Sequence, residues 1–273
     1  DVQTRVTNPA ILRKRFPPKK TEAITHLALP NASHSNAELF LKLALASGIL
    51  VAVLEVGYLL SSPLPYDPIG YVVGRDFVNT WLGSRLALTG DPGAHFGFFA
   101  YNAALKEVFG ENYPTRIWSY PPHFLLLSWP LGLMPYLTAY LVYTVLGLVL
   151  YLAVVSDGER RADHLLLLTL APATIVNIWC GQVGFLVAAL LVGGLLQLDR
   201  RPILAGVLFG LLTIKPQLGL LIPLMLVLTG RWQTTAAGIV TIMVLCAATA
   251  LAFGPGVWTA YVSDAMPVQS QVL

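Results

Sequence analysis

The sequence predicts an all-α integral membrane protein, on three observations. The chain has 273 residues, of which 56% are hydrophobic and only 11% charged, whereas soluble domains carry about 25% charged residues. Several apolar runs are about 18 residues or longer, the length that a helix needs to cross a bilayer. These runs are continuous rather than alternating, so membrane-spanning helices are favoured over a β-barrel.

The start of the chain differs from the rest. Residues 1–37 are polar and carry six Lys and Arg side chains, with four prolines that oppose a long helix. We expect a basic cytoplasmic arm that obeys the positive-inside rule rather than a tail that binds nucleic acid. Residues 38–273 form the expected membrane domain. Its cysteines, Cys180 and Cys246, lie in or beside apolar runs and are expected to be buried structural thiols.

The first half of the membrane domain divides into three segments. A membrane helix is expected over about 39–62. Residues 63–120 form an outer loop, rich in aromatic and charged residues, that should hold short helices lying in the interface. Residues 121–155 are too long for one straight crossing and contain Pro135. Either two short helices meet near this proline, or a surface or re-entrant piece precedes one full span.

The second half adds several apolar runs, which lie at about 164–180, 183–198, 203–214, 218–229 and 232–253. The Lys and Arg residues of the linkers place the N-terminus inside, and the linkers around Gln182 and Lys215 outside. One kinked crossing over 121–155 is then favoured, which gives about seven crossings. The two runs beside Lys215 are too short to span, so we expect them to meet partway into the outer leaflet, at a cavity that opens outward.

Asp76 is the first candidate for chemistry. It follows Arg75 closely after the first apolar run, in a chain that elsewhere avoids charge. A carboxylate on the outer face can act as a general base on an acceptor hydroxyl while the lipid tail of a substrate stays in the membrane. The alternative is an ordinary aspartate that is solvated or caps a helix.

Other polar residues lie at the same membrane face or within the first helix. Glu55 lies about 16 residues into that helix, roughly 24 Å from its inner end. It either faces protein or water as part of a site, or reaches the outer interface and pairs with a loop arginine. Lys215 is either a snorkelling lysine or a cation that binds a lipid phosphate.

Further candidates could bind the phosphate or the sugar of a substrate. Arginine matches phosphate oxygens well, so the phosphate-binding candidates also include Arg75, Arg85, Arg116 and His123. Gln182 and Gln217 could hydrogen-bond sugar hydroxyls or satisfy helix ends. The sequence has no Gly-rich phosphate loop, zinc-type His/Glu spacing or nucleophile elbow.

Several short motifs, in their order and spacing over about 70–260, resemble those of the polyprenol-phosphate-dependent membrane glycosyltransferases of family 87. They are Asp76-Phe77 with Trp81, Leu86-Ala87-Leu88-Thr89-Gly90-Asp91-Pro92, Tyr120-Pro121-Pro122, Gly181-Gln182, Arg201-Pro202 with Leu204-Ala205-Gly206, and Lys215-Pro216-Gln217. The family includes the mycobacterial mannosyltransferases that build phosphatidylinositol mannosides. Family members often show Gly-Gln-Asn where this chain has Val183 in the third position.

The resemblance implies a GT-C architecture, with many membrane helices and a site on the outer face of a bacterial inner membrane. It implies a sugar donor on a polyprenyl phosphate, a lipid or glycan acceptor, inversion at the anomeric carbon, and neither a cofactor nor a metal ion. The family's catalytic aspartate corresponds to Asp76. The alternative is a shortened, inactive paralogue that serves as an accessory subunit of a larger membrane complex.

Overall fold

A computed structural model describes residues 34–157 and 162–272. The chain divides into two units, 1–43 and 44–273, and most of the expected basic arm, 1–37, lies outside the described residues. Throughout the described ranges the chain forms helices and short turns without strands. The predicted all-α class is therefore confirmed.

Three helices are long and apolar enough to cross a membrane. They are α2 (His34–Leu60, in its part Leu41–Leu60), α6 (Tyr136–Val155) and α13 (Trp232–Phe253). Only 6–11% of the residues in their apolar windows are buried inside the protein, so their apolar side chains are available to lipid. A bent pair, α7 (Ala162–Leu170) with α8 (Pro172–Cys180), would make a fourth span. The expected seven crossings are not confirmed.

Two of the expected apolar runs are interrupted at prolines. The run expected over 164–180 is broken between α7 and α8, with a bend of 50°, because Pro172 lacks an amide proton and its ring opposes a continuing helix. The break at Pro135 is where the sequence predicts it, but residues 122–133 form short helical turns and only α6 is long enough to cross. A short piece therefore precedes one full span.

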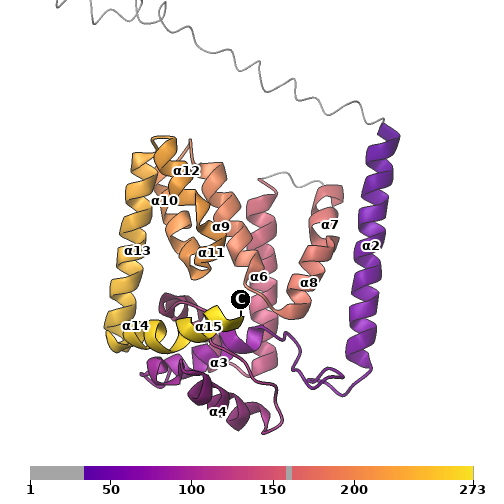
Figure 1. Cartoon of the computed structure of the whole chain (residues 1–273). Helices are drawn as coiled ribbons and strands as arrows, with labels where there is room; N and C mark the ends of the chain where they lie inside the picture. The colour runs from indigo at the N-terminus through magenta and orange to yellow at the C-terminus, as the bar shows by residue number, and fades with distance from the viewer. Residues whose placement is uncertain (1–33, 158–161, 273) are drawn as a thin grey trace, which may run out of the picture. The chain divides into compact units, whose positions relative to one another are not determined.

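The remaining apolar helices are short: α9 (Gly184–Gln197), α10 (Pro202–Leu211) with a 3-10 turn to Ile214, α11 (Pro216–Gly219) and α12 (Leu221–Leu228). The chain descends along α10 and returns along α11 and α12 (Figure 1), with Lys215 at the turn. Helix α10 packs closely on α13 because Gly206 has no side chain; a Cβ there would lie 2.4 Å from the carbonyl oxygen of Thr234.

A layer of shorter helices lies across one end of these upright helices (Figure 1). It contains α3 (Phe77–Ala87), α4 (Phe98–Phe109), α14 (Gly256–Ala260) and α15 (Met266–Val272). Its core is aromatic, with Phe77, Tyr101 and Trp118 fully or almost fully buried. Every residue of helix α3 except Arg85 is buried, so α3 belongs to the core of this layer. This layer and the turn at Lys215 position the site.

Candidate functional site

Asp76 precedes the first residue of α3, where an aspartate commonly caps the helix. Its side chain makes no capping hydrogen bond. The backbone amide of Asp76 instead donates to the carbonyl oxygen of Cys180 at 2.8 Å, which ties the start of α3 to the end of α8. The carboxylate is therefore free to contact other side chains.

Gly181 makes this junction between α3 and α8 feasible. It ends α8 in the left-handed conformation, at φ 61° and ψ 35°, which glycine adopts without strain. A Cβ at Gly181 would also lie 2.6 Å from the Cβ of Phe77 and 2.7 Å from the carbonyl oxygen of Gly74. Any larger residue would push the α8 end, with Gln182, away from Asp76.

Two side chains hold the Asp76 carboxylate. Gln182 Nε2 donates to Oδ2 at 2.8 Å, and Arg116 Nη1 lies 3.4 Å from Oδ1. Gln182, which the sequence offered as a ligand for sugar hydroxyls, thus uses its amide to orient the carboxylate. Both contacts fix the orientation of the Asp76 carboxylate.

Arg116 is itself fixed in position. The Asn102 side chain accepts from the Arg116 backbone amide and donates to its carbonyl oxygen, both at 2.8 Å. The guanidinium lies 4.6 Å from the centre of the Tyr71 ring, in a cation–π contact. Asn102 and Tyr71 thereby determine where the positive charge beside Asp76 lies.

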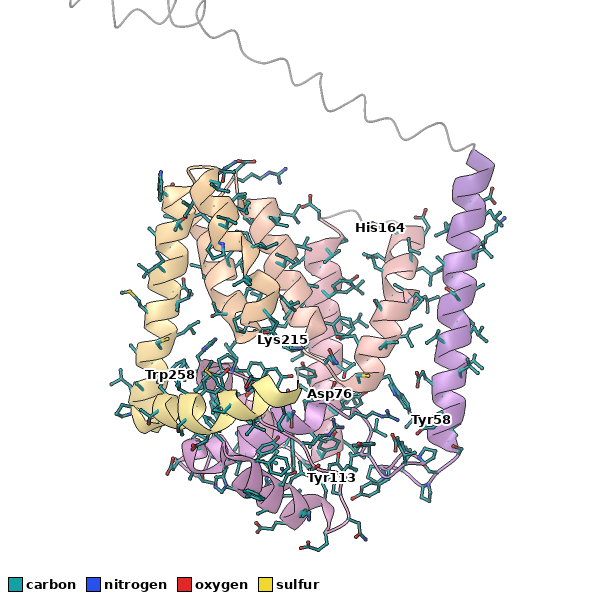
Figure 2. The ribbon with its side chains drawn as sticks, viewed as in Figure 1. Tyr58, Asp76, Tyr113, His164, Lys215 and Trp258 are labelled. Carbon is teal, nitrogen blue, oxygen red and sulfur yellow. The ribbon has the colours of Figure 1, made fainter. Side chains whose placement is uncertain are left out.

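The side chains of Asp76, Gln182 and Arg116 line a cavity of about 310 Å³. Its lining residues are Asp76, Asn79, Arg116, Ile117, Ser119, Tyr120, Gln182, Lys215, Gln217 and Gln269. Figure 2 shows Lys215 at the lower end of the α10–α12 turn and Asp76 close to it, at the start of α3. The structure thus brings together five residues that the sequence proposed independently: Asp76, Arg116, Gln182, Lys215 and Gln217.

Lys215 makes no ion pair within the part of the chain that the structure describes. Burial lowers the pKa of its ammonium group, an effect that the nearby Asp76 carboxylate opposes. Lys215 is therefore a partly buried cation that faces a cavity, and an anionic ligand could pair with it. Among the described residues, no group of three or more His, Cys, Asp or Glu side chains could hold a metal ion.

The sequence did not single out Asn79, Tyr120 and Gln269 as site residues. Asn79 lies one turn after Asp76 on α3, and its side chain accepts a 2.6 Å hydrogen bond from Tyr101 and donates to Ile117. Burial raises the pKa of Tyr120 to about 12, with a smaller contribution from the Asp76 charge, so its hydroxyl stays protonated and can donate. Of these three residues, only Asn79 could have been identified from the sequence, because its i, i+3 spacing places it on the same face of α3 as Asp76.

A second cavity of about 460 Å³ lies directly behind Lys215. It is enclosed by α10, α11, α12 and α13, and nearly all of its lining is apolar, including Leu212, Pro216 and Ile222. Pro216 is the residue between Lys215 and Gln217, which both line the polar cavity. Consecutive residues of the turn therefore line a polar and an apolar cavity.

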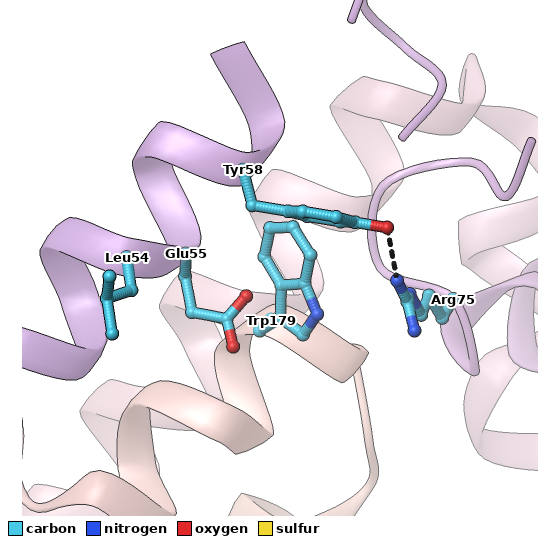
Figure 3. A pocket seen from close by; sticks show the side chains of 5 residues that line it. All are labelled: Leu54, Glu55, Tyr58, Arg75 and Trp179. Carbon is cyan, nitrogen blue, oxygen red and sulfur yellow. Dashed lines mark hydrogen bonds between the residues drawn. The ribbon is translucent and has the colours of Figure 1, made fainter. Parts of the chain in front are cut away.

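Four candidates lie outside the polar cavity: Arg75, Glu55, Arg85 and His123. Arg75 forms an ion pair with Asp67 at 2.7 Å and lines a separate groove with Glu55 (Figure 3). Arg85 is exposed and stacks on Trp81, 5.1 Å from the ring centre. His123 is buried, 3.3 Å from the Thr213 hydroxyl and stacked on Trp258.

His123 should contribute to stability in a pH-dependent way. Burial lowers its pKa to about 4, against about 6.5 in an unfolded chain. Its neutral ring stabilises the fold above a pH of about 6.5, and this contribution is lost as the pH falls towards 4. From pH 8 to pH 5 the wild type should lose about 2 kcal/mol more unfolding free energy than His123→Gln. Denaturant unfolding in detergent measures this difference, and equal losses in both proteins would contradict it.

A family model for glycosyltransferase family 87 matches residues 118–272, more than half of the chain. The matched stretch contains Gln182, Lys215 and Gln217, whereas Asp76 and Arg116 precede it. No curated protein and no solved structure matches the chain. The family match agrees with the motifs that the sequence displays and with the apolar helices of the structure. This chain belongs to glycosyltransferase family 87.

Proposed function

We propose that this glycosyltransferase moves a hexose from a polyprenyl phosphate to a hydroxyl of a lipid or glycan acceptor, with Asp76 as the general base. The single observation that carries the proposal is the polar cavity itself. Its lining includes a carboxylate, Asp76, and a cation, Lys215, which makes no ion pair with any residue that the structure describes. Glycosyl transfer from a phosphate needs a base for the acceptor and a positive charge for the leaving group.

The proposed reaction is a single displacement. The acceptor oxygen attacks the anomeric carbon as its proton passes to an Asp76 carboxylate oxygen. The bond between the anomeric carbon and the phosphate oxygen breaks, and the electron pair leaves with the polyprenyl phosphate. Because attack and departure occur on opposite faces of the sugar, the anomeric configuration inverts. Lys215 stabilises the negative charge that develops on the departing phosphate.

The apolar cavity supports a lipid-linked donor rather than a soluble one. Its lining includes Pro216, which directly follows Lys215, so the apolar chain attached to a phosphate at Lys215 could lie in this cavity. Burying each methylene group of such a chain contributes about 0.8 kcal/mol. Gln217 and Tyr120 remain on the polar side, where they could hydrogen-bond the sugar.

The proposal includes the orientation of the chain. Basic linkers at Arg160-Arg161, Arg200-Arg201 and Arg231 favour a cytoplasmic N-terminus and a site on the outer face of a bacterial plasma membrane. Residues 1–37 are then the cytoplasmic arm, and the remainder is the membrane domain.

The test is transfer by the purified chain in nanodiscs. The donor is a synthetic short-chain polyprenyl-phosphate mannose labelled in its sugar, and the acceptor is a bacterial lipid extract. We expect labelled product and an equal amount of free polyprenyl phosphate, both measured by mass spectrometry. A parallel reaction with a nucleotide-linked mannose should give no product. Transfer from the nucleotide donor alone would contradict the proposal.

A further inference from the structure

A second polar groove lies on the other side of the Arg75–Asp76 dipeptide from the polar cavity. It has a volume of about 400 Å³ and is open. Leu54, Glu55 and Tyr58 of α2 form one wall, and Trp179 of α8 and Arg75 form the other (Figure 3). Arg75 lines this groove, and the next residue, Asp76, lines the cavity of the proposed reaction.

Glu55 carries the uncompensated charge of the groove. It lies five residues before the end of α2 at Leu60, about 7.5 Å along the helix. Its carboxylate forms no hydrogen bond or ion pair with any residue in the described ranges. A carboxylate within an apolar helix is costly unless a polar partner faces it, so the Glu55 carboxylate is available to a ligand that carries hydrogen-bond donors.

Arg75 does not supply that partner. Its guanidinium donates to Asp67 through Nε at 3.0 Å, and through Nη2 to the Tyr58 hydroxyl at 3.3 Å (Figure 3). It also lies 5.7 Å from the centre of the Trp179 ring. The Arg75 charge is thus balanced by Asp67, and the groove as a whole offers acceptor oxygens and aromatic surface. This disfavours an anionic headgroup.

Aromatic rings and a carboxylate together suit a polyhydroxylated ligand. The Tyr58 and Trp179 rings lie edge to face, with centres 5.6 Å apart, and give an apolar surface for the C–H groups of a sugar or polyol. Glu55 can accept hydrogen bonds from its hydroxyls. Leu54, beside Glu55, is 62% exposed, so acyl chains attached to such a headgroup could lie along α2.

We propose that this groove binds the neutral polyhydroxyl headgroup of a membrane lipid that serves as the glycosyl acceptor. The inference rests on the proposed function, because it assigns the acceptor of that reaction. Consecutive Cα atoms are about 3.8 Å apart, so the groove at Arg75 and the polar cavity at Asp76 are neighbours along the chain. Acceptor and donor would then approach Asp76 from opposite sides, the donor from Lys215.

Binding can be measured without turnover. The probe is a monoglucosyl diacylglycerol with a fluorescent acyl chain, titrated by anisotropy against the full chain in phosphatidylcholine nanodiscs. Glu55→Gln keeps the shape of the side chain but removes its charge, and should raise the dissociation constant roughly tenfold. Trp179→Leu should weaken binding through loss of the ring. The matched control is Glu38→Gln, on the same helix but highly exposed, which should bind as the wild type does.

The outcomes separate this inference from the proposed function. Asp76→Asn should lower the rate of transfer by roughly 10²–10⁴-fold yet retain probe binding. Unchanged binding in both Glu55→Gln and Trp179→Leu would overturn the groove assignment, even if transfer depends on Asp76. Conversely, weaker binding in these variants supports the groove even if no transfer is seen.

Competition by unlabelled glucolipid but not by free methyl glucoside identifies a lipid acceptor; equal competition by both would overturn the lipid assignment.

Discussion

Asp76→Asn should lower kcat for transfer by roughly 10²–10⁴-fold, the usual contribution of a general base. Asparagine has nearly the same shape as aspartate and can still accept the hydrogen bond from Gln182, so the site should remain assembled. What it cannot do is take a proton from the acceptor hydroxyl. The KM for the polyprenyl-phosphate donor should change little, because the donor phosphate is assigned to Lys215. Steady-state kinetics with labelled donor measures both parameters.

Asp91→Asn is the matched control for this variant. Asp91 is exposed, precedes the turn Pro92–His95 and accepts only from the Ala94 amide at 3.4 Å, a role that asparagine can keep. It should transfer sugar at the wild-type rate. Full activity of Asp76→Asn, with monodisperse elution of both variants, would remove Asp76 from the mechanism.

The sequence was informative about the site because a membrane protein restricts where charge can lie. Asp76 and Lys215 are 139 positions apart, yet the positive-inside rule assigns them to one face, and the structure places both in one cavity. Gln182 and Gln217 follow for the same reason, since each lies in a linker between apolar runs. Arg116 was found because few cations occur in the loop before α6.

The sequence was less informative where tertiary packing decides. Pro172 divides one apolar run into α7 and α8, and hydropathy alone does not register that break. His123 was proposed as a phosphate ligand, but its ring is buried against Trp258. Arg75 lies beside Asp76 in sequence, yet it faces the other way and pairs with Asp67. The placements of His123 and Arg75 depend on packing partners that the local pattern does not identify, whereas the break at Pro172 follows from the proline itself.

The two cations of the polar cavity differ in their partners, and this suggests different roles. Arg116 is held by Asn102 and Tyr71 and lies 3.4 Å from Asp76, so its charge is already engaged. Lys215 has a flexible side chain and no ion-pair partner among the described residues, and it adjoins the apolar cavity. We therefore assign Arg116 to orienting the base and Lys215 to binding the donor phosphate.

Lys215→Met should lower kcat/KM for the donor by roughly 10²–10³-fold, the effect of removing one group that stabilises developing charge. Methionine preserves most of the length and apolar volume of the lysine stem, so packing at the turn should persist. Lys215→Arg keeps the charge and should retain most of the activity. The KM for the acceptor should remain close to that of the wild type, because the acceptor is assigned to the groove at Glu55.

Lys106→Met provides the control, since Lys106 lies on α4 and lines a different surface cleft. It should transfer sugar normally. Because donor and acceptor are assigned to opposite sides of Asp76, the Lys215 variant must affect one substrate far more than the other. A loss expressed only in the acceptor KM would reverse the assignment of the two cavities, and no loss at all would remove Lys215 from phosphate binding. Donor titrations at saturating acceptor, and the converse, distinguish these results.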